Sequence, residues 1–378
     1  MRLQKLLKEF IENEKTSGLV LIICTIVSLT VANSAFASKY LHFWHTLFVG
    51  QSIEYWVNDG LMTIFFLLVG LELKREIFIG ELSKIKEALL PVFGALGGMI
   101  IPATIYTIFN FGTSTQSGSG IPMATDIAFA LGVLSLLGSK VPTSLKVFLT
   151  ALAVIDDLGA ILVIAIFYTQ TLMWSNLLMA AGIFALLLLF NKLKIKSLIP
   201  YLIGGVFMWY FMLHSGVHAT ITGVILAFTI PFGKGEPKTA SYTLQHFLHK
   251  RVAFIILPIF ALANTAIVLS SDFGHTLTQN YSLGIALGLI IGKPIGIFMF
   301  AFLAVKSGIC NLPRDLNFKM LGSVGFLGGI GFTMSIFITL LAFDDAQITS
   351  NAKLVILLSS LIAAILGLFS LNLTLKKR

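Results

Sequence analysis

Two adjacent aspartates, Asp156 and Asp157, lie in the middle of the apolar stretch LKVFLTALAVIDDLGAILVIAIFYT. A stretch of this length and composition is typical of a membrane-spanning helix. A charge at the bilayer centre costs at least about 2.5–3.5 kcal/mol on insertion scales, so such residues usually face a polar cavity and bind something. The pair therefore marks a candidate site for protons or small cations.

Two carboxylates at close range can bind a hard cation through their oxygen atoms. Successive helix positions are about 100° apart, so both side chains can border one cavity. Burial and mutual repulsion favour the protonated forms of neighbouring carboxylates, so protons and sodium compete for the same oxygens. Such competition is in itself a mechanism of exchange. The alternative is that the pair only joins helices through buried hydrogen bonds.

A third carboxylate, Asp126, lies in IPMATDIAFALG, where Pro122 and Thr125 suggest an interrupted helix. Unwound backbone inside a membrane is tolerated only where it is buried in protein or lines a cavity. A carboxylate beside the N-terminus of a half-helix is stabilised by the positive end of the helix dipole. We expect Asp126 to compensate this end of the dipole, and direct binding of sodium is the second interpretation.

Lys293 lies in the apolar stretch LIIGKPIGIF, between Gly292 and Pro294. It can neutralise the carboxyl ends of broken helices, pair with an aspartate of the site, or release a proton during transport. The sequence does not rank these three roles.

A second break is suggested by four glycines in VGFLGGIGFTMSIF, namely Gly325, Gly328, Gly329 and Gly331. One interrupted span in each half of a chain is typical of transporters built from inverted repeats, with the binding site near the midplane. The alternative is that the glycines only permit close helix packing.

The composition of the whole chain is that of a polytopic, all-α membrane protein. Hydrophobic residues make up 57% and charged residues 11%, whereas a soluble chain carries about 25% charged residues. Apolar runs predict twelve spans, at 17–36, 59–79, 89–110, 121–138, 146–169, 174–190, 198–213, 216–232, 252–270, 282–305, 321–343 and 352–372. The division between the seventh and eighth spans, at His214–Gly216, is the weakest.

The distribution of basic residues predicts the orientation. With a cytoplasmic N-terminus and twelve spans, all of the 26 Lys and Arg except Lys39, Lys293 and Lys353 fall on the cytoplasmic side. This excess follows the positive-inside rule, so the net charge of +9 does not indicate a nucleic-acid partner. Lys39 and Lys353 fall on the outer side, which leaves Lys293 as the single lysine of the interior.

We expect one transmembrane domain across residues 1–378. An amphipathic N-terminal segment, 1–16, would lie on the cytoplasmic membrane surface. The twelve spans occupy 17–372, and 373–378 form a basic cytoplasmic tail.

Six strings carry a resemblance to a known family: VNDGLMTIFFLLVGLELKRE, PMATDIAFALGVLSLLGSKVP, ALAVIDDLGAILVIAIFYT, SGVHAT, IGKPIGI and GGIGFTMSIFI. They closely resemble the bacterial NhaA-type Na⁺/H⁺ antiporters, from about residue 17 to the C-terminus. The resemblance implies twelve helices in the inner membrane, with the fourth and eleventh unwound where they cross. It also implies electrogenic, pH-regulated exchange of Na⁺ or Li⁺ for H⁺ without a cofactor.

The resemblance further implies roles for particular residues. Asp156 and Asp157 match the pair that binds sodium and protons. Asp126 and Lys293 match charge-compensating residues, with Lys293 forming an ion pair with Asp156 that sodium breaks. We group Thr125 with them, and Gly328, Gly329 and Gly331 with the backbone of the second break.

Other matches lie towards the two membrane surfaces. Asp59 matches an acidic residue of the outward ion path. Residues linked to pH regulation match at Glu72, Glu76, His218, His246 and His249. Without the resemblance, the two histidines of TLQHFLHKR would be solvated surface residues, and Glu72 and Glu76 could simply cap a basic helix end beside Lys74 and Arg75.

Two departures from the family pattern bear on assembly and regulation. The loop at 37–58 is shorter than in the best-known members, where a β-hairpin joins two protomers, so the implied homodimer is less secure. Gln245 replaces an acidic residue before His246, and basic residues upstream are missing, so the pH set point is expected to differ.

Three other functions compete with antiport. An intramembrane aspartyl protease would show a Gly-x-Gly-Asp element and a second aspartate on another helix, which the contexts of Asp126 and Asp156–Asp157 lack. A sodium channel would conduct without moving protons. A sodium-coupled symporter would need an organic substrate and more polar residues within its spans. The sequence therefore favours a transporter that exchanges two cations over an enzyme.

Overall fold

Apolar helices form most of this structure, which is a computed structural model. It describes residues 2–169, 171–233, 236, 239–269 and 273–376, and for 2–15, 81, 85 and 139 it describes the backbone alone. The chain divides into two compact units, each assembled from separate stretches of sequence. Unit 1 comprises Met1–Phe43, Lys84–Ala160 and Ala261–Arg378, and unit 2 comprises Trp44–Ser83 and Ile161–Phe260. The predicted cation site therefore lies in unit 1.

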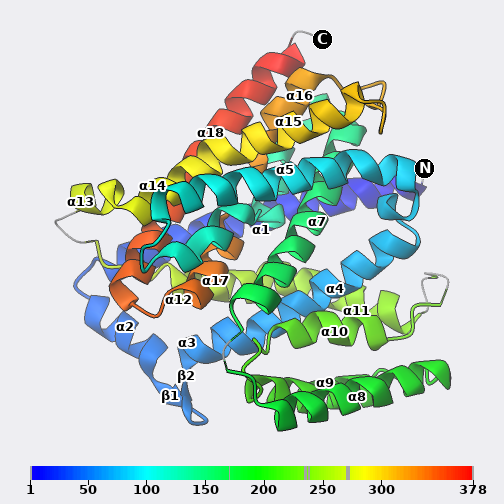
Figure 1. Ribbon diagram of the computed structural model, residues 1–378, viewed down its shortest axis with the longest axis vertical. Helices are drawn as coiled ribbons and strands as arrows, with labels where there is room; N and C mark the ends of the chain where they lie inside the picture. The colour runs from blue at the N-terminus through cyan, green and yellow to red at the C-terminus, as the bar shows by residue number, and fades with distance from the viewer. Residues whose placement is uncertain (1, 170, 234–235, 237–238, 270–272, 377–378) are drawn as a thin grey trace. The chain divides into compact units, whose positions relative to one another are not determined.

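Unit 1 contains both predicted breaks. Its elements are α1 (Arg2–Ala32), α2 (Ala37–His45), α5 (Ile85–Asn110), the 3₁₀ segment η3 (Gln116–Met123), α6 (Ile127–Ser135), η4 (Gly138–Lys140), α7 (Thr143–Phe167), α12 (Leu257–Asn264), α13 (Phe273–Thr278), α14 (Asn280–Leu287), the π segment η6 (Gly288–Gly292), α15 (Lys293–Lys306), α16 (Phe318–Gly328), α17 (Phe332–Ala342) and α18 (Ala346–Lys376) (Figure 1). The helices α2, α7 and α12 continue into unit 2.

The first break separates η3 from α6 at residues 124–126. It forms because Asp126 adopts an extended conformation and caps α6, its side chain accepting a hydrogen bond from the Phe129 N–H. The second break, at residues 329–331, separates α16 from α17, which are bent by 49°. The predicted interruption of the fourth and eleventh spans is therefore confirmed.

Lys293 is positioned by the close packing of α15 against α5. A Cβ atom on Gly97 would lie 2.1 Å from the carbonyl oxygen of Gly296, and one on Gly296 would lie 2.1 Å from that of Gly97. Only glycine permits two helices to approach so closely. The π segment η6 ends at Gly292 immediately before Lys293, and Pro294 follows in the first turn of α15, where proline needs no hydrogen-bond partner.

Unit 2 holds the predicted outward path and the predicted regulatory residues. Its elements are β1 (Leu47–Phe48), β2 (Gln51–Ser52), α3 (Ile53–Tyr55), the π segment η1 (Trp56–Leu61), α4 (Met62–Phe78), η2 (Glu81–Ser83), α8 (Trp174–Lys192), α9 (Ile199–Leu213), α10 (Ile221–Thr229), α11 (Ala240–Arg251) and the π segment η5 (Val252–Ile256). Within this unit α4 packs closely on α10, since a Cβ atom on Gly223 would lie 2.2 Å from the Thr63 carbonyl oxygen.

Helices occur at all twelve positions where the sequence predicts a span. Within the described ranges, eight are long and apolar enough to cross a membrane, or up to ten if the bent pairs α1–α2 and α16–α17 each count as one span. The seventh and eighth, α9 and α10, are shorter than predicted, with 15 and 9 residues. The first residues of the predicted eighth span form a turn between the two helices instead. In this turn Gly216 has φ 86°, and a Cβ atom there would lie 2.2 Å from the Thr171 carbonyl oxygen.

The loop predicted at 37–58 contains α2 and a β-hairpin. Strands β1 and β2 pair antiparallel, with Leu47 opposite Ser52 and Phe48 opposite Gln51. Val49 and Gly50 both have positive φ, as the tight turn of a two-residue hairpin requires. Each strand therefore offers only two residues for pairing.

Candidate functional site

Asp156 lies at the centre of the buried site in unit 1. Its Oδ2 atom accepts hydrogen bonds from the Lys293 ammonium and, at 2.7 Å, from the Thr125 hydroxyl. The side chains of Asp156 and Lys293 are completely buried. The sequence left three roles open for Lys293. The structure contains one of them, the ion pair with an aspartate of the site, Asp156.

The second carboxylate oxygen of Asp156 has a different environment. Its Oδ1 atom is buried and accepts no hydrogen bond from any side chain or backbone group that the structure describes. An unsatisfied buried acceptor is costly, and the cost is larger for a charged group. Asp157, 3% exposed, follows Asp156 on α7. The site thus combines two buried carboxylates with an oxygen that a bound cation or proton would satisfy.

Thr125 connects Asp156 to both breaks. The residue is completely buried within the first break, and its Oγ1 atom lies 2.7 Å from Asp156 Oδ2 and 2.8 Å from the Gly328 carbonyl oxygen. A hydroxyl group carries one hydrogen and can donate it to only one of these acceptors at a time. Thr125 therefore divides its hydrogen between the ion site and the end of α16.

Asp126 bridges the N-termini of two half-helices. Its Oδ1 accepts from the Phe129 N–H at 3.0 Å, and its Oδ2 accepts from the N–H and the hydroxyl of Thr333 at the start of α17. Its own N–H donates to the Ile330 carbonyl at 2.7 Å, which joins the two breaks directly. Both oxygens are thus engaged by donors, so the geometry fits compensation of two helix dipoles better than direct coordination of a cation.

Space requires glycine most firmly at Gly329 of the second break, where the obstructing atom belongs to the backbone, whereas at Gly328 it is the end of a flexible side chain. A Cβ atom on Gly329 would lie 2.3 Å from the Leu289 carbonyl oxygen, and one on Gly328 would lie 2.6 Å from Ile297 Cδ1. Gly328, Gly329 and Gly331 all have negative φ, so their backbone conformation does not require glycine. The sequence left two interpretations of these glycines open, a helix break and close helix packing. Both occur in the structure.

In unit 2, Asp59 lies in the π segment η1 and is half-buried. Its Oδ2 accepts a hydrogen bond from the Trp209 indole N–H on α9 at 3.0 Å. The indole fixes the carboxylate without neutralising it, because the donor is uncharged.

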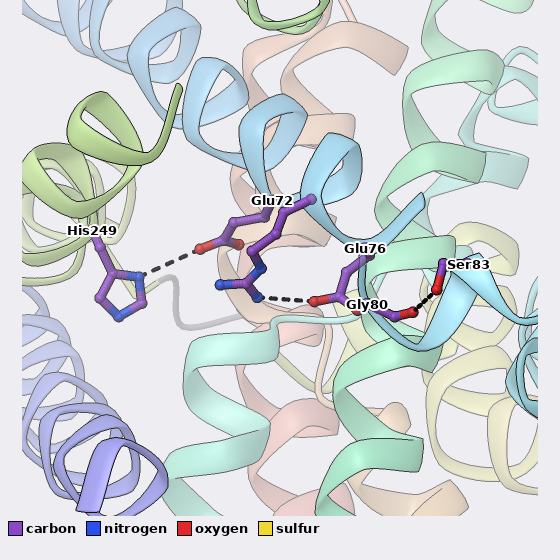
Figure 2. Close-up of polar contacts among 6 residues, drawn as sticks. Glu72, Glu76, Gly80, Ser83 and His249 are labelled. Atoms are coloured by element: carbon purple, nitrogen blue, oxygen red, sulfur yellow. Dashed lines mark hydrogen bonds and ion pairs between the residues drawn. The ribbon is translucent and has the colours of Figure 1, made fainter. Parts of the chain in front are cut away.

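Two polar pairs involve α4: Glu72 with His249 of α11, and Glu76 with its neighbour Arg75. Figure 2 shows Glu72, Glu76 and His249, and we call these three residues and Arg75 the acid–histidine cluster. His249 Nδ1 lies 3.4 Å from Glu72 Oε1, and the two side chains are 23% and 22% exposed. Arg75 pairs with Glu76 at 2.9 Å. Beyond Glu76 the chain turns at Gly80, whose carbonyl accepts from the Ser83 hydroxyl, as Figure 2 shows.

The other two predicted histidines lie outside this cluster. His246 is exposed and stacks on Tyr242 of the same helix, with ring centroids 6.1 Å apart and an interplanar angle of 4°. His218 is half-buried in the turn before α10 and hydrogen-bonds to the backbone of Tyr168. The structure therefore brings only one of the three histidines to an acidic partner of the predicted set.

Comparisons with known proteins agree with this geometry. A family model described as Na⁺/H⁺ antiporter 1 matches residues 8–371. The chain belongs to this family of antiporters. It is 71% identical to the Na⁺/H⁺ antiporter NhaA of Flavobacterium psychrophilum over 376 residues, which cover 100% of this chain and 98% of that protein. It is 62% identical to the NhaA of Cytophaga hutchinsonii, with 100% and 97% covered, and 57% identical to that of Dechloromonas aromatica, with 98% and 96% covered.

Membership of the Na⁺/H⁺ antiporter 1 family confirms the resemblance found in the motifs. Together with the apolar helices, it makes the chain a multi-pass bacterial membrane protein.

Lys74, near the end of the predicted span 59–79, is also buried within the protein. Lys74 is 5% exposed, and its ammonium donates to the carbonyls of Ala227, Phe228 and Ile230 at the C-terminal end of α10. A cation there complements the negative end of the helix dipole. Nothing in LELKRE distinguishes Lys74 from its neighbour Arg75, because the difference arises from the packing of α4 on α10.

The sequence pattern also did not indicate the buried contacts of Lys353 and Thr333. Lys353, assigned to the outer surface by its position in the chain, is 8% exposed and donates to Asn264 Oδ1 at 3.1 Å. Thr333 binds Asp126 through both its N–H and its hydroxyl. A signal for Thr333 existed, since a hydroxyl two residues after a predicted glycine break lies in the first turn of the next half-helix.

Proposed function

We propose that this chain exports Na⁺, or Li⁺ in its place, in exchange for protons that enter the cell, and so serves sodium and pH homeostasis. The observation that carries the proposal is the environment of Asp156. Its Oδ2 holds Lys293 and Thr125, its Oδ1 accepts no hydrogen bond from any described residue, and Asp157 follows it on α7. The family and the names of the relatives support the same exchange.

Asp156 and Asp157 bind either sodium or protons. A carboxylate oxygen is a suitable ligand for a hard cation and can also accept a proton. Sodium entering the site displaces protons, and protons arriving from the other side displace sodium.

Lys293 competes with the transported cation for Asp156. Its ammonium donates to the same carboxylate that sodium would use, so sodium binding requires this ion pair to open. Removing one partner of a buried ion pair leaves an uncompensated charge, so the exchange of partners must be concerted. Lys293 thereby compensates the charge of Asp156 when sodium leaves.

Movement of the two broken helices opens the site to alternate sides of the membrane. Thr125, Asp126, Gly328, Gly329 and Gly331 belong to this moving part. The hydrogen bonds that join the two breaks support their motion as one body, and family folds of this kind alternate by displacement of one repeat against the other.

The exchange is electrogenic. One sodium ion bound to the two carboxylates can displace up to two protons, one from Asp157 and one from Lys293 as its ion pair with Asp156 opens, so net positive charge enters in each cycle. The membrane potential then assists export by about 2.3 kcal/mol per charge per 100 mV.

The transporter forms one domain in the inner membrane, with both termini in the cytoplasm. Asp59 lies on the outward ion path. The acid–histidine cluster tunes activity with pH, because a histidine changes charge near physiological pH. The resemblance adds His218 and His246 to this group, and His246 has the smaller share since it contacts no acidic residue of the set.

A homodimer, where it forms, is weak. The hairpin strands contain two residues each, so an intermolecular sheet through them would be short. The lipid bilayer is the partner that the exposed apolar helix faces require.

The test is sodium-induced dissipation of a proton gradient in everted membrane vesicles, measured across neutral pH. Wild-type activity should rise with pH and accept lithium, and Asp157→Asn should abolish it while the protein remains folded. Asp344→Asn, a change of the same type at an exposed position, serves as the control and should leave activity unchanged.

Two outcomes would contradict the proposal in different ways. If neither sodium nor lithium moves protons through the wild type, the chain is not an exchanger of these ions. If Asp157→Asn still exchanges them, the exchange stands and the assignment of the site is wrong.

A further inference from the structure

The start of α17 is a buried helix end whose N–H groups need acceptors. The first N–H groups of any helix have no partner within it, and inside a membrane water does not supply one. Phe332 and Thr333, the first two residues of α17, are each 2% exposed. Other elements must therefore satisfy this end.

The cap position of α17 cannot supply the acceptor. Gly331 occupies it and makes no side-chain hydrogen bond. A Cβ atom on Gly331 would lie 2.1 Å from Ser335 Oγ and 3.1 Å from Leu289 Cδ2. A serine or asparagine, the usual residues at such a position, would not fit without displacing these neighbours.

Two other helices supply the acceptors instead. The Thr333 N–H donates to Asp126 Oδ2, at the start of α6, at 3.1 Å. The Phe332 N–H donates to Ser360 Oγ, on α18, also at 3.1 Å. Ser360 is 3% exposed, and the helix around it is predominantly apolar. Its hydroxyl therefore has a specific partner in the second break.

The same helix also holds the other half of the broken span. Ser323 of α16 lies 2.6 Å from Ser370 of α18, oxygen to oxygen, and 3.3 Å from the hydroxyl of Thr374. Figure 1 shows α18, in red, running beside α16. Hydroxyl contacts from one continuous helix thus reach both sides of the break.

We propose that Ser360 is a positioning residue for the cation site, acting through α17, and this inference rests on the proposed exchange function. Ser360 accepts a hydrogen bond from the Phe332 N–H, and the next residue, Thr333, donates to Asp126. Thr125 directly precedes Asp126 and donates to Asp156. Without the Ser360 hydroxyl, the first turn of α17 loses an anchor and Thr125 loses its fixed position against Asp156. The last helix, which carries no charge at the site, thereby sets the affinity for sodium.

The test compares the sodium dependence of exchange in three variants. Ser360→Ala should weaken the apparent affinity for sodium by between about twofold and thirtyfold, the range of coupling through such networks, with little change in the rate at saturating sodium. Ser360→Thr keeps the hydroxyl and should retain most of the affinity. Ser359→Ala is the matched control, because Ser359 is equally buried at 2% exposure but points about 100° away around α18.

Equal sodium dependence in Ser360→Ala and Ser359→Ala would overturn the proposal. If Ser360→Ala is not recovered from the membrane, Ser360→Cys replaces it, since a thiol has nearly the same size and is a weak acceptor. Wild-type sodium dependence in Ser360→Cys would likewise overturn it.

A second measurement separates this inference from the exchange function itself. Hydrogen–deuterium exchange of the backbone at the start of α17 needs no transport. Faster exchange there in Ser360→Ala than in Ser359→Ala is the expected result, and equal rates would refute the anchoring contact. Loss of transport in the wild type and in Ser359→Ala alike would instead count against the exchange function.

Discussion

The buried site of unit 1 and the acid–histidine cluster of unit 2 place similar groups in opposite environments. In the buried site, Asp156 and Lys293 have completely buried side chains that bind each other directly. In the cluster, Glu72 and His249 are 22% and 23% exposed and lie 3.4 Å apart. Breaking a buried pair by removing one partner is strongly destabilising, whereas a solvated pair contributes about 0–1 kcal/mol.

This difference supports the separate tasks that we propose for the two regions. A completely buried pair changes partners only when another charge replaces one of its members, which suits the binding and release of a cation. A partly exposed pair responds to the proton concentration of the adjoining water, which suits regulation. The predictions below test this division, beginning with the largest expected effect.

Removing the charge of Lys293 should destabilise the protein strongly. Lys293→Met keeps the length of the side chain but leaves Asp156 buried without its cation, for which about 3–5 kcal/mol is expected. Asp156→Asn added to Lys293→Met should restore much of the loss, because no uncompensated charge remains. The measurement is the temperature of thermal denaturation in detergent.

Lys306→Met is the matched control for this comparison. Lys306 ends the same helix, is exposed, and lies 5.7 Å from the centroid of the Phe302 ring. Its variant should denature close to the wild-type temperature. Equal denaturation temperatures for Lys293→Met and Lys306→Met would show that the buried pair of Lys293 and Asp156 contributes no more to stability than an exposed lysine does.

The sequence predicted the elements of the buried site well, for a physical reason. Charges and helix-breaking residues are rare within apolar spans, so Asp126, Asp156, Asp157, Lys293 and the glycines stand out against their surroundings. The first break also follows from local chemistry, namely the aspartate cap of α6, whereas the glycines of the second break answer to packing against Leu289 and Ile297 of other elements. The roles assigned to these residues remain proposals.

Contacts made by ordinary residues could not be predicted in the same way. Lys74 and Arg75 are adjacent in the chain, yet Lys74 caps α10 while Arg75 pairs with Glu76. Ser360 is one of many serines, and its partner is a backbone N–H group 28 residues away in sequence. Such contacts depend on the packing of helices, which a pattern of residue types in one chain does not specify.

Substitution of Thr125, within the buried site, should have an intermediate effect on the apparent affinity for sodium. Thr125→Val removes the hydroxyl at nearly constant volume, so Asp156 and Gly328 both lose a donor that they now share. Hydrogen bonds to charged groups contribute about 1.5–3 kcal/mol, which corresponds to about tenfold or more in apparent sodium affinity. Titration of exchange with sodium measures the change, and Thr125→Ser should retain the affinity. If both variants bind sodium as the wild type does, the hydroxyl has no part in the site.

Substitutions in the His249–Glu72 pair of unit 2 should have a smaller effect, on the pH of activation rather than on sodium affinity. The ion pair between His249 and Glu72 requires a protonated imidazole, so it is lost when the proton leaves. If this contact stabilises the inactive form, His249→Gln and Glu72→Gln should each move activation to lower pH by less than about one unit. The double variant should shift no further than either single one, because the two residues act through one contact. The pH profile of exchange at saturating sodium measures this, and a change in sodium affinity would contradict the division of tasks.

His246 should have the smallest effect of all, although the family resemblance places it beside His249. The two histidines are three residues apart on α11, but His246 is exposed and stacks on Tyr242, whereas His249 is half-buried and faces Glu72. An exposed histidine that contacts no acidic residue of the predicted set transmits little to its surroundings. His246→Gln should therefore keep the wild-type pH profile under the conditions in which His249→Gln shifts it. An equal shift in both variants would mean that the charge of the whole α11 surface, rather than the contact with Glu72, sets the response to pH.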